Sequence, residues 1–467
     1  MKQVIRLSTV QHQPQNNGEK LLRVLFFTLV LSVMNVSMFN VVLPTISREF
    51  QLTSSEVSWM VTAYMIVYAI GSVTYGKLAD KYRLKDLLTF GLLFFAIGSA
   101  VGMFATEYWM VIVGRVLQSL GASVIPATAM IVPVRYFSPE KRGRALGTTA
   151  SGLALGTAIG PIISGFVSSV FSWRMLFLIS LLSLLTLPFY RKYLDDRKGE
   201  AGRTDLIGGG LLAATVATLL LAVTNGSWLL AGTGLVLFIL FVFRIQRAAD
   251  PFVQPQLFQN KAYSYGVGIA FIATGLSFGI PFITPQMLAN LHHLSPAMIG
   301  FIMFPGAIAS SLLGRTGGRL ADERGNTFLL YLASTLQLLC FGCLSLFAGM
   351  SPYLVMATLI MGNLGQTFMQ IAMSNTISRT LTRQQTGIGM GLFSMLNFIS
   401  GATATALIGR VLDHGPPALQ FSPLSMPREA VVYSNTYLFL GVLVVLVLFL
   451  YYLRRIRTEG RAKQPAA

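Results

Sequence analysis

Two stretches of the sequence, "GKLADKYRLKDLL" at 76–88 and "GRLADERGN" at 318–326, carry the same glycine–aspartate pattern. The second begins 242 residues after the first (318 − 76), and each follows a long apolar segment. A pattern that recurs across half a chain indicates an internal duplication. We therefore predict two structurally similar halves.

The sequence around these stretches is strongly apolar. Of the 467 residues, 54% are hydrophobic and only 17 are Asp or Glu, which is too little polar surface for a soluble protein. Fourteen apolar stretches are long enough to cross a hydrocarbon core of about 30 Å. Because lipid offers the backbone no hydrogen-bond partner, we expect helices. The predicted spans are 22–44, 58–78, 86–104, 109–134, 145–169, 173–190, 207–224, 228–243, 263–291, 297–320, 327–348, 352–375, 386–411 and 433–453.

The predicted fold is an all-α polytopic membrane protein built from two six-helix bundles with two extra helices between them. We place the first bundle in 1–190, the extra helices and their linkers in 191–255, and the second bundle with a cytoplasmic tail in 256–467. Charged runs at 191–205 and 244–261 mark the two boundaries. We expect a monomer.

The basic residues set the expected orientation. Most of the 35 Lys and Arg residues fall in alternate loops and at the two chain ends, which predicts that both termini are cytoplasmic. The formal net charge of +18 is thereby assigned to topology and to contact with anionic lipid, not to nucleic-acid binding.

The repeated stretches are candidate gating elements. A small glycine allows close helix approach, and an aspartate at a helix end can pair with basic residues or with a helix amino terminus. Such a cluster could hold the inner side of the bundles shut. The alternative is a charged loop that only determines topology. The residues concerned are Gly76, Asp80, Lys85, Gly318, Asp322 and Arg324.

A second candidate gating element is a glycine face in the fifth predicted span. Gly152, Gly156 and Gly160 recur every four residues, followed by Pro161 and Gly165. One interpretation is ordinary close packing of two helices, and the other is a seam between the bundles that governs which side opens.

Polar residues inside the spans are candidates for a substrate cavity. Arg115 lies about two turns into its span, where an arginine costs several kcal/mol unless it meets water, a partner or a cavity. Amides and hydroxyls among apolar side chains suit a small amphiphilic organic molecule, whereas interhelical hydrogen bonding is the alternative for any one of them. The candidates are Asn35, Asn40, Arg115, Gln118, Gln286, Asn363, Gln366, Gln370 and Asn397.

The sequence resembles the major facilitator superfamily, in particular its fourteen-helix drug/proton antiporters of the tetracycline-efflux type. The resemblance rests on the two opening stretches and on four more motifs. It implies a transporter of the bacterial plasma membrane that exports a small molecule by alternating access, driven by proton entry. The further motifs are "NVVLP" at 40–44, "GRVLQSLGAS" at 114–123, "GLALGTAIGPIISG" at 152–165 and "DPFVQPQLF" at 250–258.

Several positions depart from that family pattern. Asn35 stands where related exporters have an acid, Thr157 and Gly401 stand where tetracycline exporters have glutamates, and Arg83 replaces a glycine that Gly325 keeps. A cavity with an arginine and no carboxylate should reject cations and prefer neutral or anionic substrates. The remaining candidates for proton coupling are Asp80, Asp205 and Asp322.

Other function classes are disfavoured. The sequence has no GxxxxGK[ST] phosphate loop and no HExxH metal motif, so we expect neither an ATP-driven pump nor an enzyme, and no cofactor or metal. The remaining alternatives are an exporter of an endogenous metabolite or self-made antibiotic without classical proton coupling, and a transporter-like sensor that moves no cargo.

Overall fold

The computed structural model describes residues 15–79, 81–195, 205–382, 385–415, 417, 419–424 and 426–462. Asp80, one of the candidate gating and proton-coupling residues, lies outside this part. The described part has fourteen helical segments that are long and apolar enough to span a membrane, and each overlaps one predicted span. This confirms the all-helical, fourteen-span prediction.

The first six spans are formed by the helices of the first bundle. Two spans are broken into shorter pieces: α4 and α5 together make the fourth, and α7, η1 and α8 make the sixth. The bounds are α1 Gln15–Glu49, α2 Ser54–Ala79, α3 Leu84–Met103, α4 Tyr108–Ala122, α5 Val124–Tyr136, α6 Pro139–Val170, α7 Met175–Leu181, η1 Leu182–Thr186 and α8 Leu187–Tyr193.

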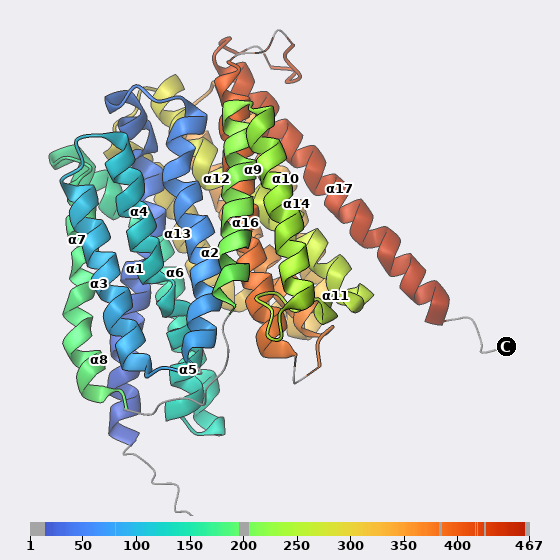
Figure 1. The fold of residues 1–467 in the computed structure, drawn as a ribbon. Helices are drawn as coiled ribbons and strands as arrows, with labels where there is room; N and C mark the ends of the chain where they lie inside the picture. Colours follow the sequence, from blue (N-terminus) through green and yellow to red (C-terminus); the bar gives the residue numbers. More distant parts are fainter. Residues whose placement is uncertain are drawn as a thin grey trace, which may run out of the picture.

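Two further helices, α9 and α10, precede the six spans of the second bundle, and α9 packs against both α2 and α16 (Figure 1). The division at 190/191 and 255/256 stays a prediction. The bounds are α9 Leu206–Asn225, α10 Trp228–Arg247, α11 Gln256–Gln259, α12 Lys261–Leu291, α13 Pro296–Arg324, α14 Asn326–Phe347, α15 Pro352–Ser378, α16 Thr386–Asp413 and α17 Ala430–Ala462.

The two groups of helices meet along two long seams. One seam is α2 against α16, and the other is α6 against α13. We call the end of the bundle where α1 begins and α17 ends the inner end; it is the lower end in Figure 1. The opposite end is the outer end, where α1 passes to α2 and α16 passes to α17. That the inner end faces the cytoplasm stays a prediction.

The two copies of the opening pattern differ in local structure. Helix α2 ends at Ala79, whereas the second copy stays helical until α13 ends at Arg324. Gly325 then has φ +87° and ψ 153°, a conformation that only glycine adopts readily. Arg83 has φ −65° and ψ 129°, which suits any residue. The first loop therefore tolerates an arginine where the second needs a glycine.

Asp205 anchors the two inserted helices at the inner end. Its carboxylate caps α9 by accepting from Gly208 N and is paired with Arg244 of α10 at 2.9 Å. It also accepts from Phe252 N, in the segment that leads to the second bundle. Burial would raise the pKa of this carboxyl, but the hydrogen bonds and the Arg244 charge outweigh burial and lower the pKa. Asp205 is thus held ionised.

Candidate functional site

The seam between α6 and α13 is tight at the outer end and loose at the inner end. A methyl group added at Gly300 would lie 2.3 Å from Pro161 O, and one at Gly165 would lie 2.8 Å from the backbone of α13. Gly318 and Gly147 lie about five turns further along the same faces of these helices. A methyl group at either would meet no atom within 4 Å.

The seam between α2 and α16 has the same asymmetry. A methyl group at Gly409, near the outer end of α16, would lie 2.9 Å from Ser54 O. At Gly391, about five turns nearer the inner end on the same face, it would meet nothing within 4 Å, and the same holds for Gly76 of α2. Both seams therefore diverge toward the inner end and are closed at the outer end.

Polar contacts between the two bundles reinforce the outer closure. The Asp413 carboxylate, where α16 ends, accepts hydrogen bonds from the backbone of Ser54 at 2.6 Å and of Ser55 at 3.1 Å, at the amino terminus of α2. Arg48, in the last turn of α1, donates to Ala289 O at 2.6 Å near the carboxyl end of α12. Each charge has the sign that a helix terminus favours.

Arg115 is enclosed within the first bundle. Its side chain is 1% exposed, and its Nη1 donates to Asn35 Oδ1 at 2.6 Å and to Gln118 Oε1 at 3.0 Å. The guanidinium also lies 4.1 Å from the ring centre of Tyr64 and 4.5 Å from that of Phe39. Amide oxygens and aromatic faces thus stabilise this cation in place of a carboxylate.

The Arg115 network links five helices. Gln118 donates onward to Ser99 of α3 at 2.8 Å, and Asn35 donates to Ser180 of α7 at 2.6 Å. Arg115 Nε reaches Met60 O of α2 at 3.3 Å. Three of the predicted substrate residues, Asn35, Arg115 and Gln118, are thus brought together, with their polar groups directed to one another and not to an opening in this conformation.

The predicted residues of the second bundle lie in separate places. Asn363 and Gln366 of α15 are half-buried and Gln370 is exposed, so these three side chains become more exposed toward the inner end of α15. Gln286 is buried and donates to Phe282 O of its own helix. Asn397 is buried and accepts from Thr274 of α12 at 3.2 Å. Asn40 of α1 is also buried.

The glycine face of α6 packs against two helices, α1 and α13. Added methyl groups at Gly152, Gly156 and Gly160 would lie 3.1, 2.6 and 1.8 Å from atoms of α1, within the same bundle. Only Pro161 and Gly165 meet α13 across the seam. The first three glycines form a close helix pair, and the other two belong to the contact between the bundles.

The remaining candidate gating residues lie at the inner end. Asp322 and Arg324 are exposed, and the Arg324 guanidinium lies 5.2 Å from the ring centre of Phe328. Lys85 is half-buried in the first turn of α3. Gly76 and Gly318 make no close approach, as expected where the inner ends of the helices stand apart.

Three charged residues that join the two bundles are absent from the candidates predicted from the sequence. They are Arg48, Asp413 and Arg315. Arg315 lies inside the tenth span, on α13, and its Nη2 donates to Ser151 Oγ of α6 at 3.2 Å. Its position within the predicted span 297–320 was the available signal.

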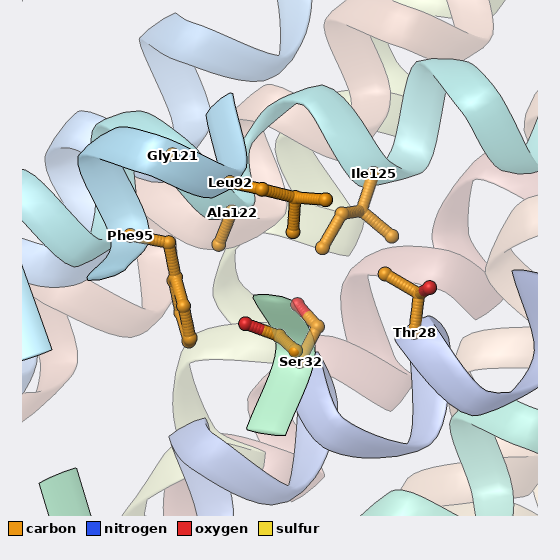
Figure 2. A pocket seen from close by; sticks show the side chains of 8 residues that line it. Thr28, Ser32, Leu92, Phe95, Gly121, Ala122 and Ile125 are labelled. Carbon is orange, nitrogen blue, oxygen red and sulfur yellow. The ribbon is translucent and has the colours of Figure 1, made fainter. Parts of the chain in front are cut away.

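A crevice inside the first bundle is distinct from the seams. It is narrow and is lined by small hydroxyl and apolar side chains from α1, α3, α4, α5 and η1 (Figure 2). Because the lining residues all come from one bundle, the crevice does not lie between the halves. The lining residues are Thr28, Ser32, Leu92, Phe95, Gly121, Ala122, Ile125 and Ser183.

Comparison with known sequences agrees with this architecture. The family model described as Major Facilitator Superfamily matches residues 25–405. The riboflavin transporter RibZ of Clostridioides difficile (strain 630) is 28% identical over 386 residues, which cover 80% of this chain and 84% of the relative. A multidrug resistance protein B homolog of Mycobacterium tuberculosis (strain CDC 1551 / Oshkosh) is 27% identical over 408 residues, covering 82% and 74%.

Solved structures share the fold at low sequence identity. A POT family transporter in complex with 5-aminolevulinic acid superposes with a TM-score of 0.70 at 13% identity, covering 92% of this chain and 95% of that one. A bacterial homolog of the human lysosomal transporter Spinster, in an inward-facing and unoccupied conformation, gives 0.68 at 13% identity, covering 97% and 100%. At this identity the likeness concerns the fold alone.

Proposed function

The chain belongs to the Major Facilitator Superfamily, whose matching relatives are transporters and not enzymes, and we propose that it exports a small amphiphilic organic compound by alternating access. The observation that carries the proposal is the asymmetry of the two seams, which are closed at the outer end and open at the inner end. An exporter must present such a state to load cargo from the cytoplasm. We place the protein in the bacterial plasma membrane with both termini cytoplasmic.

The charge distribution supports a neutral or anionic cargo. Every described carboxylate lies at a helix end or in a loop, so no described acid stands at the middle of a span to receive a cation. Of the arginines within the described spans, Arg115 in the first bundle and Arg315 in the second lie furthest from the span ends. Cations are therefore disfavoured inside the protein.

Riboflavin is a specific compound to test, because one relative that is similar over most of its length is named a riboflavin transporter. Another relative is named as a multidrug resistance protein homolog, which supports drug export. A drug, an endogenous metabolite and a self-made antibiotic can each be a neutral or anionic amphiphile, so the charge distribution does not distinguish among them.

Proton antiport is the energy source we propose, with Asp322 as the candidate carboxylate among the described residues and Asp80 as the candidate outside them. Asp322 is exposed at the inner end, where it can exchange protons with water. Asp205 is a weaker candidate, because its lowered pKa, its three hydrogen bonds and its ion pair with Arg244 keep it ionised.

The test is uptake into inside-out membrane vesicles, which present the inner end to the added compounds. Vesicles with and without the protein receive riboflavin and matched neutral, anionic and cationic aromatic compounds, before and after the proton gradient is collapsed. We expect gradient-dependent accumulation of neutral or anionic compounds. Accumulation of ethidium alone would overturn the charge argument.

The same vesicles separate the alternatives. Flux that follows a substrate gradient but ignores pH indicates an exchanger or a metabolite exporter without proton coupling. Saturable binding with no flux in either direction indicates a sensor. The Asp322→Asn variant, compared with Asp205→Asn, tests whether the carboxylate at the repeated pattern is needed.

A further inference from the structure

Arg315 lies within a span and faces the widened inner part of the seam between α6 and α13. It lies about 14 Å along the α13 axis from Arg324, hence inside the tenth span. The side chain is exposed, and it crosses the seam to donate to Ser151 of α6. By contrast, Arg115 is enclosed by its own bundle.

Arg315 also differs from neighbouring arginines in its pairing. Arg319, one turn nearer the inner end, is paired with Glu323 at 2.5 Å, and Arg144 of α6 is paired with Glu19. Among the described residues no carboxylate pairs with Arg315, whose partner across the seam is a neutral hydroxyl. Its positive charge is therefore available to a ligand.

Side chains suited to an amphiphile lie at the same level as Arg315. Gly152, next to Ser151, packs on the backbone of Phe26 in α1, and the adjacent Phe27 is 64% exposed. On the other side, an added methyl group at Gly314 would lie 3.6 Å from Thr367 of α15, one turn from the exposed Gln370. Ser151 of α6 and Thr367 and Gln370 of α15 thus offer hydroxyl and amide groups to a ligand whose anionic head lies at Arg315.

Closure of the seam at the inner end would change the surroundings of the positive charge on Arg315. Arg315 is about four turns from Gly300 on a neighbouring part of the same helix face, and Gly300 is in backbone contact with α6 at the outer end. If the inner end closes in the same way, the guanidinium is enclosed between α6 and α13. Enclosing an unpaired cation costs several kcal/mol, whereas a bidentate carboxylate, phosphate or sulfonate partner offsets that cost.

We propose that Arg315 determines specificity by binding an anionic group of the substrate, so that occupancy by an anion allows the inner seam to close. This inference rests on the proposed transport function and narrows its substrate class from neutral or anionic compounds to anionic ones. Arg115 keeps its separate role as the centre of the first-bundle network.

The local charge is measured with a reporter cysteine that needs no known substrate. Ser151→Cys is placed in a background with Cys340→Ser and Cys343→Ser, and inside-out vesicles are labelled with methanethiosulfonates of opposite charge. Relative to the rates of the two reagents with a free thiol in solution, Arg315 should make the sulfonated reagent react several-fold faster than the trimethylammonium reagent. The ratio of the two rates cancels any change in thiol reactivity. Arg315→Gln should abolish the preference, and Arg319→Gln should retain it.

Binding is tested with two probes that differ only in charge, naphthalene-2-carboxylate and naphthalene-2-carboxamide. We expect the carboxylate to slow labelling of the reporter more than the amide does, and we expect Arg315→Gln to remove the difference. Equal protection by both probes, protection by neither, or an unchanged rate ratio in Arg315→Gln overturns the inference. Anion-selective protection without gradient-driven flux would instead contradict the transport function alone.

Discussion

The outer and inner halves of the two seams are built from different groups. At the outer end, glycines bring backbone against backbone, and Asp413 and Arg48 bind helix termini of the opposite bundle. At the inner end, Gly318 and Gly391 meet nothing, and one long arginine spans the gap to a serine. Short-range packing holds the closed half, and the open half has only a contact that a flexible side chain can make or lose.

From this difference we can predict which substitutions should change the balance between the state that is open at the inner end and the state that is open at the outer end. A change that disturbs backbone contact at the outer end should favour outer opening, whereas the same change at the inner end should not. A common reporter is Thr405→Cys in a background without Cys340 and Cys343. Thr405 is buried one turn from Gly409, and it is labelled in whole cells with a membrane-impermeant maleimide.

Gly300→Ala should have the largest effect. The new methyl group meets Pro161 O at 2.3 Å, and overpacking of about 1 to 3 kcal/mol corresponds to roughly a five- to hundred-fold shift toward outer opening. Labelling of the reporter should rise and vesicle uptake should fall. Gly318→Ala, on the same helix face, is the matched control. An equal rise in outer labelling with Gly318→Ala would contradict the inferred difference in packing between the two ends.

Asp413→Asn should have the next largest effect. The amide can still accept from Ser54 and Ser55, but it loses the charge that favours the amino terminus of α2, about 1 kcal/mol. Outer labelling should rise roughly five-fold. Glu429→Gln, which removes another acid at the outer end, should leave labelling unchanged. No difference between the two variants would show that Asp413 does not hold the closed half.

Arg48→Gln should have a smaller effect. The side chain is exposed, so its bond to Ala289 O contributes about 0.5 to 1 kcal/mol, and outer labelling should rise about two- to five-fold. Arg428→Gln serves as the control at the same end. If Arg48→Gln exceeds Gly300→Ala, polar contacts and not glycine packing dominate the outer closure.

Asp205→Asn should leave the balance of the two ends unchanged. It weakens the insert anchor, which crosses neither seam, so the free energy of unfolding should fall by about 1 to 2 kcal/mol while reporter labelling stays the same. Because the folded-state pKa is below the ordinary value of 3.8, the anchor contributes fully above about pH 4 and is lost only at lower pH. Loss of gradient-driven uptake with normal stability would instead assign Asp205 to proton coupling.

Some features of the site could be expected from the sequence, and others depended on distant neighbours. Because Arg115 and Asn35 are polar and lie within spans, each was expected to have a polar partner. In the structure Arg115 Nη1 donates to Asn35 Oδ1 at 2.6 Å. Their direction was not predictable, because it depends on contacts with Tyr64 and Phe39 from other helices. For the same reason the spacing of Gly152, Gly156 and Gly160 predicted close packing but did not identify α1 as the partner.

Fourteen helices in two similar sets could be predicted from the sequence, because the bilayer core offers no hydrogen-bond partner to the polar backbone of an apolar segment. Which end of the seams is closed, and which arginine faces the opening, could be seen only from the packed helices. Both depend on the angle between two bundles, and that angle is set by contacts such as Gly300 with Pro161, between residues far apart in the chain.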